Sequence, residues 1–444
     1  MVQIMTTAII LIFVAGYLLV ALESVIHISK TAVALLMAVF CWALLYLGTG
    51  ASGEQASAFT RALGENSEIL FFLMGAMVIV EVVDANGGFD FVRQRLLSRT
   101  KRSLLWKLTL TTFFLSAVLD NMTTAIVMVM LLNKIVSDPR DKLLYSCMVI
   151  LAANSGGAFS PIGDVTTIML WVKGNISTLG VVKSLFIPSL VSVLVPGLIL
   201  SINMKGMVSG SSGKDFLNGR EAGDMEPTGA CGCTGSCCCG GSAMREKLIV
   251  FVFGVGGLLF VPVFRFMTGL PPFMGILLVL ALLWIVTELL LRDRHASGVS
   301  YMLHKIDLST ILFFLGILTA VAALAETGVL RSLGIFLDEA SGGNPYIVTS
   351  VIGFFSAVVD NVPLVASCMG MYDTAFYAPD STFWLLLAYC AGIGGSMLII
   401  GSAAGVVVMG LQKISFGWYL RHFSWLALVG YLSGILAFFL QELL

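Results

Sequence analysis

Apolar segments long enough to cross a bilayer follow one another along almost the whole chain, and this constrains its fold most. A helix of about 20 apolar residues spans the hydrocarbon core. We predict such spans at 5–22, 31–48, 67–84, 180–203, 248–268, 272–291, 308–326 and 423–441. Only 11% of the residues are charged, against roughly a quarter in soluble domains. The sequence therefore predicts an all-α, polytopic membrane protein.

One short phrase occurs twice inside further apolar segments. FFLSAVLDNM at 113–122 returns as GFFSAVVDNV at 353–362. A carboxylate in an apolar stretch is costly, and such residues usually face a polar cavity and mark an ion pathway. The phrase therefore supplies the first candidate site residues: Ser116, Asp120, Asn121, Ser356, Asp360 and Asn361.

The segment around the first phrase, 104–136, is too long for one straight span. As a single helix it would measure about 50 Å, against a hydrocarbon core of about 30 Å. Its central Asp-Asn pair predicts a helical hairpin with that pair at the tip, either re-entrant or built from two short spans. Residues 345–372 predict a second hairpin in the same way.

Two other long segments, 143–173 and 382–412, also contain breaks. The first is interrupted by NSGGAFSPIGD at 154–164. Paired glycines, a proline and an Asp interrupt helical hydrogen bonding and leave backbone groups without partners. Such groups are tolerated at membrane depth only in protein-lined or wet cavities. Discontinuous helices of this kind are the usual ion sites of secondary transporters. They add further candidates: Asn154, Asp164 and Ser396, with Ser155 and Ser402 as additional oxygen ligands. Thr123, just after the first Asp-Asn pair, is a further oxygen ligand.

The two halves of the chain match beyond their hydropathy. FFLMGAMVIVEVVD at 71–84 parallels FFLGILTAVAALAE at 313–326, which pairs Asp84 with Glu326. GGAFSPIGD at 156–164 parallels GGSMLIIGS at 394–402, so Asp164 has no acidic counterpart. We predict a first transmembrane repeat at 1–203, a Gly/Ser/Cys-rich linker at 204–246 and a second repeat at 247–444.

Basic residues predict opposite orientations for these repeats. The basic stretch 89–103 and the linker should be cytoplasmic under the positive-inside rule. Five other basic residues then lie inside too, namely Arg292, Arg294, Lys305, Lys413 and Arg421, whereas the loops 49–66 and 373–381 hold only Arg61. This is an inverted-topology repeat, typical of secondary transporters with a site at the repeat interface. We expect a multi-pass protein of the cytoplasmic (inner) membrane.

The residues gathered at the two tips and two breaks suit cation exchange. Hard cations prefer all-oxygen sites, and a carboxylate that holds either a proton or a metal ion is sufficient chemistry for cation/proton exchange. The alternative is that the Asp residues only cap the helix breaks. For the matched acids Asp84 and Glu326, the alternative to a place in the ion site is a place at the membrane boundary.

Three segments carry a family resemblance. SAVLDNMTTAIVM, NSGGAFSPIGDVTT and SAVVDNVPLVA resemble signature segments of NhaD-type sodium/proton antiporters, members of the ion transporter superfamily. The resemblance covers nearly the whole chain except the linker. It implies Na⁺ or Li⁺ and H⁺ as transported ions, and it implies ion binding by Ser116, Asp120, Asn121, Asn154, Asp164, Ser356, Asp360, Asn361 and Ser396. Dicarboxylate symporters of the same superfamily carry a neutral Ser-Asn-Thr at comparable tips, so Asp there favours a cation without an anionic substrate.

The linker holds a cysteine cluster that this family does not require: Cys231, Cys233, Cys237, Cys238 and Cys239. Thiolates could bind a soft metal, or some could be acylated near the membrane. The spacing matches no standard zinc pattern, so a tolerated low-complexity linker is the simpler interpretation.

Two other functions stay open at this point. One is an anion carrier or arsenite exporter of the same superfamily, and the other is a membrane metal or redox sensor that uses the cysteine cluster. We expect no enzyme, because no nucleophile-base set or nucleotide loop is present, and no cofactor. A net charge of −1 gives no reason to expect a nucleic-acid partner. A homodimer is kept as an alternative to a monomer.

Overall fold

A computed structural model describes residues 2–21, 26, 28–49, 53–88, 96, 98, 100–204, 206–208, 240–290, 299–358 and 360–443. These residues are almost entirely helical, with one isolated β-bridge between Thr100 and Met207. Six of the described helices are long and apolar enough to cross a membrane. The predicted class, an all-α polytopic membrane protein, is confirmed.

Both breaks predicted in the first half are present, at 117–120 and at 159–164. The segment 104–136 consists of two helices, and so does 143–173. The helices of this half are α1 (Val2–Ala21), α3 (Lys30–Thr49), α4 (Gly53–Ala85), α6 (Lys101–Ser116), α7 (Asn121–Ile135), α8 (Pro139–Ala158), α9 (Val165–Val172) and α10 (Thr178–Asn203).

The second half has the same breaks in its hairpin and in its last long segment. Its helices are α11 (Gly240–Thr268), α12 (Pro272–Leu290), α13 (Val299–Met302), α14 (Leu308–Glu326), α15 (Val329–Ser341), α16 (Pro345–Ser356), α17 (Asn361–Met371), α18 (Thr382–Gly394), α19 (Ala403–Gln412), α20 (Phe416–His422) and α21 (Ser424–Leu443). Helix α11 begins inside the segment predicted as linker. The five linker cysteines lie outside the described residues.

One loop prediction is wrong. Residues 49–66 were expected to form a loop, but α4 begins at Gly53 and runs unbroken to Ala85. Its first turns contain Ala, Glu, Gln and Arg, which are good helix formers. They are also polar, so an apolar-length criterion finds only the later part of the helix.

Each of the four half-helices starts at a polar residue that caps it. The side chain of Asp120 accepts a hydrogen bond from the Thr123 backbone N–H at 2.9 Å, and Asp360 accepts from Val362 at 3.4 Å. Asp164 caps α9 through Thr166 at 3.2 Å. Ser402 caps α19 through Gly405 at 3.2 Å. These caps satisfy backbone donors at helix starts that are cut off from water.

The first helix of each hairpin touches a broken helix through its backbone. A Cβ added to Gly156 in α8 would lie 2.1 Å from the carbonyl oxygen of Phe113 in α6. A Cβ added to Gly394 in α18 would lie 2.3 Å from the carbonyl oxygen of Gly353 in α16. Only glycine permits so close an approach, so each hairpin is pressed against its neighbouring broken helix.

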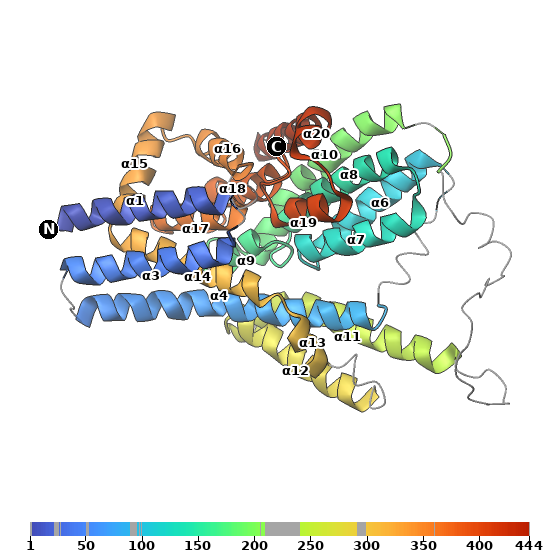
Figure 1. The fold of residues 1–444 in the computed structure, drawn as a ribbon, viewed down its shortest axis with the longest axis horizontal. Helices are drawn as coiled ribbons and strands as arrows, with labels where there is room; N and C mark the ends of the chain where they lie inside the picture. The colour runs from blue at the N-terminus through green and yellow to red at the C-terminus, as the bar shows by residue number, and fades with distance from the viewer. Residues whose placement is uncertain are drawn as a thin grey trace.

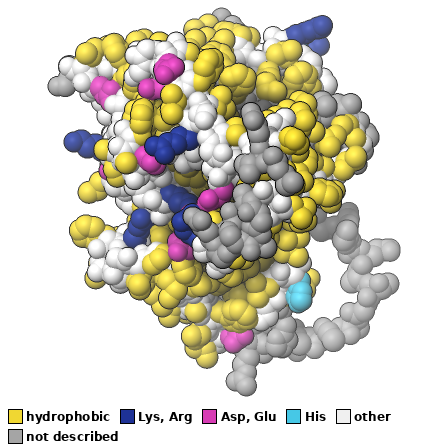
Figure 2. Space-filling model, turned by 90° about the vertical axis from the view of Figure 1, so that its left-hand side faces the viewer, with side chains coloured by type: hydrophobic (Ala, Val, Ile, Leu, Met, Phe, Trp, Pro, Cys, Tyr) yellow, Lys and Arg dark blue, Asp and Glu magenta, His cyan; other side chains and the backbone are white. Residues whose placement is uncertain are grey.

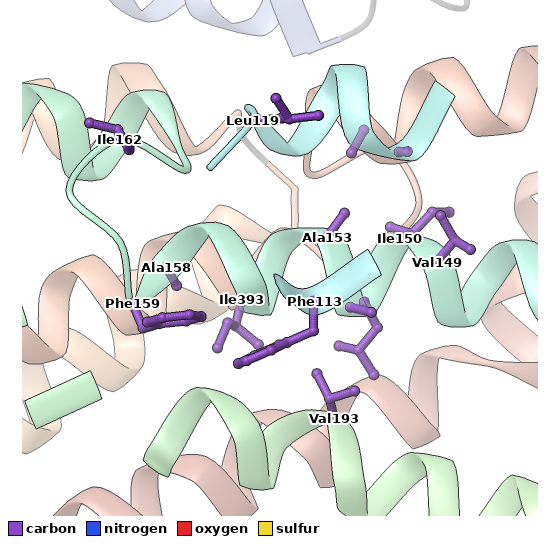
Figure 3. Packing of buried hydrophobic residues seen from close by; sticks show 14 of the residues in the cluster. Phe113, Leu119, Val149, Ile150, Ala153, Ala158, Phe159, Ile162, Val193 and Ile393 are labelled. Carbon is purple, nitrogen blue, oxygen red and sulfur yellow. The ribbon is translucent and has the colours of Figure 1, made fainter. Parts of the chain in front are cut away.

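Aromatic packing surrounds the first of these contacts. The rings of Phe113 and Phe159 stack with centroids 5.0 Å apart. Figure 3 shows the two rings side by side, with Val193 of α10 and Ile393 of α18 close by. All four side chains belong to one buried cluster that includes residues from both halves of the chain. The site described below is therefore held in a tightly packed interior.

The hairpins occupy opposite ends of the molecule. Figure 1 shows α6, α7 and α8 in the right-hand part and α15, α16 and α17 in the left-hand part, with the broken ends of α8, α9, α18 and α19 between them. Helices α4, α11 and α12 run along the lower edge. Figure 2 looks at the left-hand end of the molecule and shows charged side chains among hydrophobic ones on that face. Large hydrophobic side chains are also exposed on many of the described helices. Because lipid tails accept apolar surface, this distribution suits a protein embedded in a bilayer.

Candidate functional site

Asn154, near the end of α8, is the centre of a buried group of neutral side chains. Its Nδ2 donates to the hydroxyl of Ser396 at 2.8 Å and to the hydroxyl of Ser402 at 2.9 Å. Its Oδ1 accepts from Nδ2 of Asn121 at 3.1 Å. We call these four residues the amide cluster. All four are buried, and they join the first half of the chain to the second.

Asp164, at the start of α9, is the most buried of the predicted carboxylates, with 1% of its surface exposed. Its Oδ2 accepts from Nδ2 of Asn361 at 3.3 Å, and its Oδ1 accepts from the Thr166 backbone at 3.2 Å. No Lys, Arg or His in the described part of the chain forms an ion pair with it. Long hydrogen bonds alone compensate a buried charge poorly, so a proton or a cation would stabilise this carboxylate.

The two tip carboxylates, Asp120 and Asp360, are partly buried. Asp120 accepts hydrogen bonds from both the backbone and the hydroxyl of Thr123 and borders a small hollow that Phe72 and Leu258 also line. The charges of Asp360 and Asp120 both act on Asp164. The structure thus brings Asp120 and Asp360 into electrostatic range of Asp164, and the Asn361 amide donates to Asp164.

Three predicted serines form hydrogen bonds that fasten helices together. Ser116 donates to the carbonyl of Ala153 at 2.6 Å, and Ser356 donates to the carbonyl of Ala391 at 2.7 Å. The first bond joins α6 to α8, and the second joins α16 to α18. Ser155 bonds to Ser192 of α10 at 3.0 Å and so faces away from the amide cluster.

Comparisons of the sequence with known proteins identify transporters. A family model described as Citrate transporter matches residues 9–384. Sodium/proton antiporter 1 of Arabidopsis thaliana is 44% identical over 96% of this chain and 71% of its own length. Sodium/proton antiporter 2 of the same plant is 43% identical over 96% of this chain and 98% of its own length. The Na(+)/H(+) antiporter NhaD of Alkalimonas amylolytica is 30% identical over 96% of this chain and 88% of its own length.

The chain belongs to the citrate-transporter family, among its NhaD-type sodium/proton antiporters. The resemblance predicted from the Asp-Asn phrases is therefore confirmed. The matched family and relatives are transporters, so this NhaD-type chain is a transporter and not an enzyme.

The paired acids Asp84 and Glu326 lie at helix ends of this NhaD-type chain. Asp84 is in the last turn of α4. Glu326 ends α14 and forms an ion pair with Arg61 at 2.9 Å. This position agrees with the alternative in which such acids lie at the membrane boundary. Groups of three or more His, Cys, Asp or Glu side chains able to hold a metal are not found among the residues with a described placement.

A cavity of about 330 Å³ lies at the far ends of α9 and α17, between α4 and α14. Two ion pairs border it, Arg61 with Glu326 and Lys173 with Glu65. Helix α9 starts at the cap Asp164, and α17 starts at the cap Asp360. The cavity therefore stands one half-helix away from the buried acids and offers a polar approach from the end of the molecule on which α4 begins.

Sequence reasoning missed several residues of this NhaD-type site. The backbone N–H of Thr166 donates to the Asp164 side chain, the Thr167 hydroxyl donates to the Asp164 carbonyl at 2.8 Å, and Gly392 lies against the Asp164 carboxylate. Thr124 is fully buried, with a hydroxyl that has no hydrogen-bond partner among the described residues. These threonines lie two or three residues after the Asp-Asn and Gly-Asp pairs, so the positions after each break were the available signal.

Proposed function

We propose that the protein is a secondary active transporter that exchanges Na⁺, or Li⁺, for protons across the membrane. The observation that carries this proposal is the buried Asp164, which receives amide and backbone donors, has no ion-pair partner among the described residues and lies near Asp120 and Asp360. Relatives at 44% and 43% identity bear the name sodium/proton antiporter, which supports the same exchange here.

Competition for the carboxylates would couple the two ions. A cation approaching Asp164 would displace its proton, because two positive charges cannot share the site at the same cost. The oxygens of Asn361, Thr166 and Thr167 would supply neutral ligands, as hard cations require. On the opposite side of the membrane a proton would displace the cation. A higher proton concentration should therefore raise the Na⁺ concentration needed for half-maximal exchange.

An inverted repeat is the architecture that would give the site access from both sides. Three observations support it: the matched helix caps, the matched glycine contacts and hairpins that extend toward opposite ends of the molecule (Figure 1). In this proposal residues 1–203 and 247–444 are the repeats, each hairpin is re-entrant, and the linker 204–246 faces the cytoplasm. The hairpin-bearing parts would move by an elevator or rocking motion in the inner membrane.

Exchange is tested with purified protein in vesicles that contain a pH-sensitive dye. Addition of Na⁺ should dissipate an imposed pH gradient, and a panel of cations would rank Na⁺, Li⁺ and K⁺. Asp120→Asn should lower the rate strongly. An Asp120→Asn protein that exchanges at the normal rate would contradict the proposed role of the tip carboxylates.

An anion carrier is the second candidate, because the matching family model is described as Citrate transporter. Acids at both hairpin tips count against an anionic substrate, since like charges in a poorly solvated site repel. Citrate-dependent flux in the same vesicles, without Na⁺-dependent proton movement, would favour this candidate.

A further inference from the structure

We infer that the protein has a single cation seat, between Asp164 and Gly392, and that Asn154 closes the corresponding seat in the other half. The inference rests on the proposed cation/proton exchange and specifies where, and how many times, the cation binds. It follows from a comparison of positions that match between the two halves.

At three aligned positions, the two halves carry side chains of different chemical type. Continuing the alignment of 156–164 with 394–402 by two residues pairs Asn154 with Gly392. The same alignment pairs Ala158 with Ser396 and Asp164 with Ser402. One set combines Asn154 with two serines across the interface. The other combines Gly392 and Ala158 with a carboxylate.

The first set is filled. Asn154 donates both of its amide hydrogens, to Ser396 at 2.8 Å and to Ser402 at 2.9 Å, and its oxygen is occupied by Asn121. An amide NH₂ group is a donor and cannot ligate a cation. This half therefore presents fixed hydrogen-bond donors where the other half presents a carboxylate, and its backbone breaks are satisfied without any ion.

The second set has the same neighbours without the amide. A Cβ placed on Gly392 would lie 3.3 Å from Oδ2 of Asp164 and 3.4 Å from the Cβ of Ala158. The contact of position 392 with 158 and 164 thus mirrors the contact of Asn154 with Ser396 and Ser402. Because Gly392 has no side chain, nothing from position 392 donates to Oδ2, which accepts from the Asn361 amide at 3.3 Å.

The carboxylate of Asp164 makes the second set the stronger cation ligand of the two. Asp164 carries the charge, and the small residues Gly392 and Ala158 add no further donor to the Asn361 amide and the Thr166 backbone N–H from which it already accepts. The other half lacks the charge at Ser402 and has its donor in place. One Na⁺ per chain follows, although the chain carries two hairpin tips and two broken helices.

The test combines a binding count with one exchanged position. Equilibrium binding of radiolabelled Na⁺ to the purified full-length chain should give one ion per chain. Gly392→Asn supplies the missing amide and should raise the Na⁺ concentration for half-saturation by about tenfold, the size expected when a donor competes for a charged group. Gly392→Ala adds the Cβ without the amide and should shift the Na⁺ concentration for half-saturation by less than about threefold.

The outcomes separate this inference from the proposed exchange. Two Na⁺ per unmodified chain, or equal shifts in Gly392→Asn and Gly392→Ala, would overturn the single seat while exchange in vesicles continued. Absence of any Na⁺ binding by the unmodified chain would overturn both. If Gly392→Asn fails to fold, the double variant Asn154→Gly with Ser402→Asp tests the same idea from the other half. It should raise the count from one Na⁺ to two, and an unchanged count would contradict the inference.

Discussion

Nδ2 of Asn361 donates a hydrogen bond to Oδ2 of Asp164 at 3.3 Å, whereas the matching residue Asn121 donates to the neutral Asn154 at 3.1 Å. Two asparagines at equivalent positions after the hairpin tips therefore donate to a carboxylate in one case and to an amide in the other. Hydrogen bonds to charged groups contribute more than bonds between neutral groups. The same substitution should have unequal consequences at the two positions.

Asn361→Ala should raise the KM for Na⁺ by about tenfold, and Asn121→Ala by no more than about threefold, because only the first removes an amide oxygen that we propose as a neutral cation ligand beside Asp164. Initial rates of Na⁺-driven proton release from vesicles measure both values. Melting temperatures of the two proteins in detergent provide the control for folding. Equal KM values would show that the contact with Asp164 does not contribute to cation binding.

Asp164→Asn should abolish exchange to below about 1% of the normal rate, because it removes a charge that cation binding requires. Asn is as good a helix cap as Asp, so the start of α9 should be preserved. Asp138→Asn is the matched control, since Asp138 caps α8 outside the site by accepting from the Arg140 backbone at 2.8 Å. That protein should exchange normally. Retained exchange in Asp164→Asn would remove the basis for the proposed site.

Gly156→Ala and Gly394→Ala should each destabilise the protein by about 1–3 kcal/mol or more, because the added methyl meets a backbone carbonyl that cannot turn away. The contacts would be 2.1 Å and 2.3 Å. Gly410→Ala in α19 is the control, as a Cβ there meets nothing within 4 Å. Thermal unfolding in detergent should show two lowered transitions and one unchanged or raised transition. Equal melting temperatures would mean that the helices can separate at little cost.

Glu326→Gln should change the exchange rate by less than about twofold, since exposed ion pairs contribute little. The side chain of Arg61 is 66% exposed and that of Glu326 is 36% exposed, with 2.9 Å between their charged atoms. Arg61→Gln should behave alike, and so should the double variant. A loss of exchange in Glu326→Gln that is absent in Arg61→Gln would instead give this acid a direct part in ion passage.

Replacement of Cys231, Cys233, Cys237, Cys238 and Cys239 by Ser should leave Na⁺/H⁺ exchange within about twofold of normal, because thiolates are soft ligands whereas a hard cation such as Na⁺ prefers oxygen. The vesicle assay described above measures this. Stoichiometric soft-metal binding by the unmodified chain, together with reduced exchange after substitution, would support a sensing role for the cluster.

Much of the fold could be predicted because breaks in apolar segments have a strong chemical signature. Asp120 and Asp164 are the caps at which α7 and α9 begin, since a polar cap satisfies the backbone donors of a helix start away from water. The first part of α4 could not be predicted in this way. Residues 53–66 are polar, and their helicity follows from propensity and tertiary packing, which a hydropathy criterion does not register.

The sequence predicted which residues belong to the candidate site better than it predicted how they are arranged. Asn154, Ser396 and Ser402 were named from sequence, but their mutual hydrogen bonds connect positions far apart in the chain and depend on how α8 crosses α18 and α19. Gly392 carries no functional group, so no chemical signal marks it. Its relevance appears only when its neighbours in space are known.

The glycine contacts of α6 with α8 and of α16 with α18 have a consequence for how the two halves of such a chain can diverge. Where backbones touch, no side chain larger than hydrogen fits, so those positions hold the scaffold to one shape in both halves. Side chains that point into the interior between the halves carry no such restriction. The charge, size and hydrogen-bonding character of one half can therefore change without deforming the other, which lets a duplicated framework acquire two unlike faces around one ion.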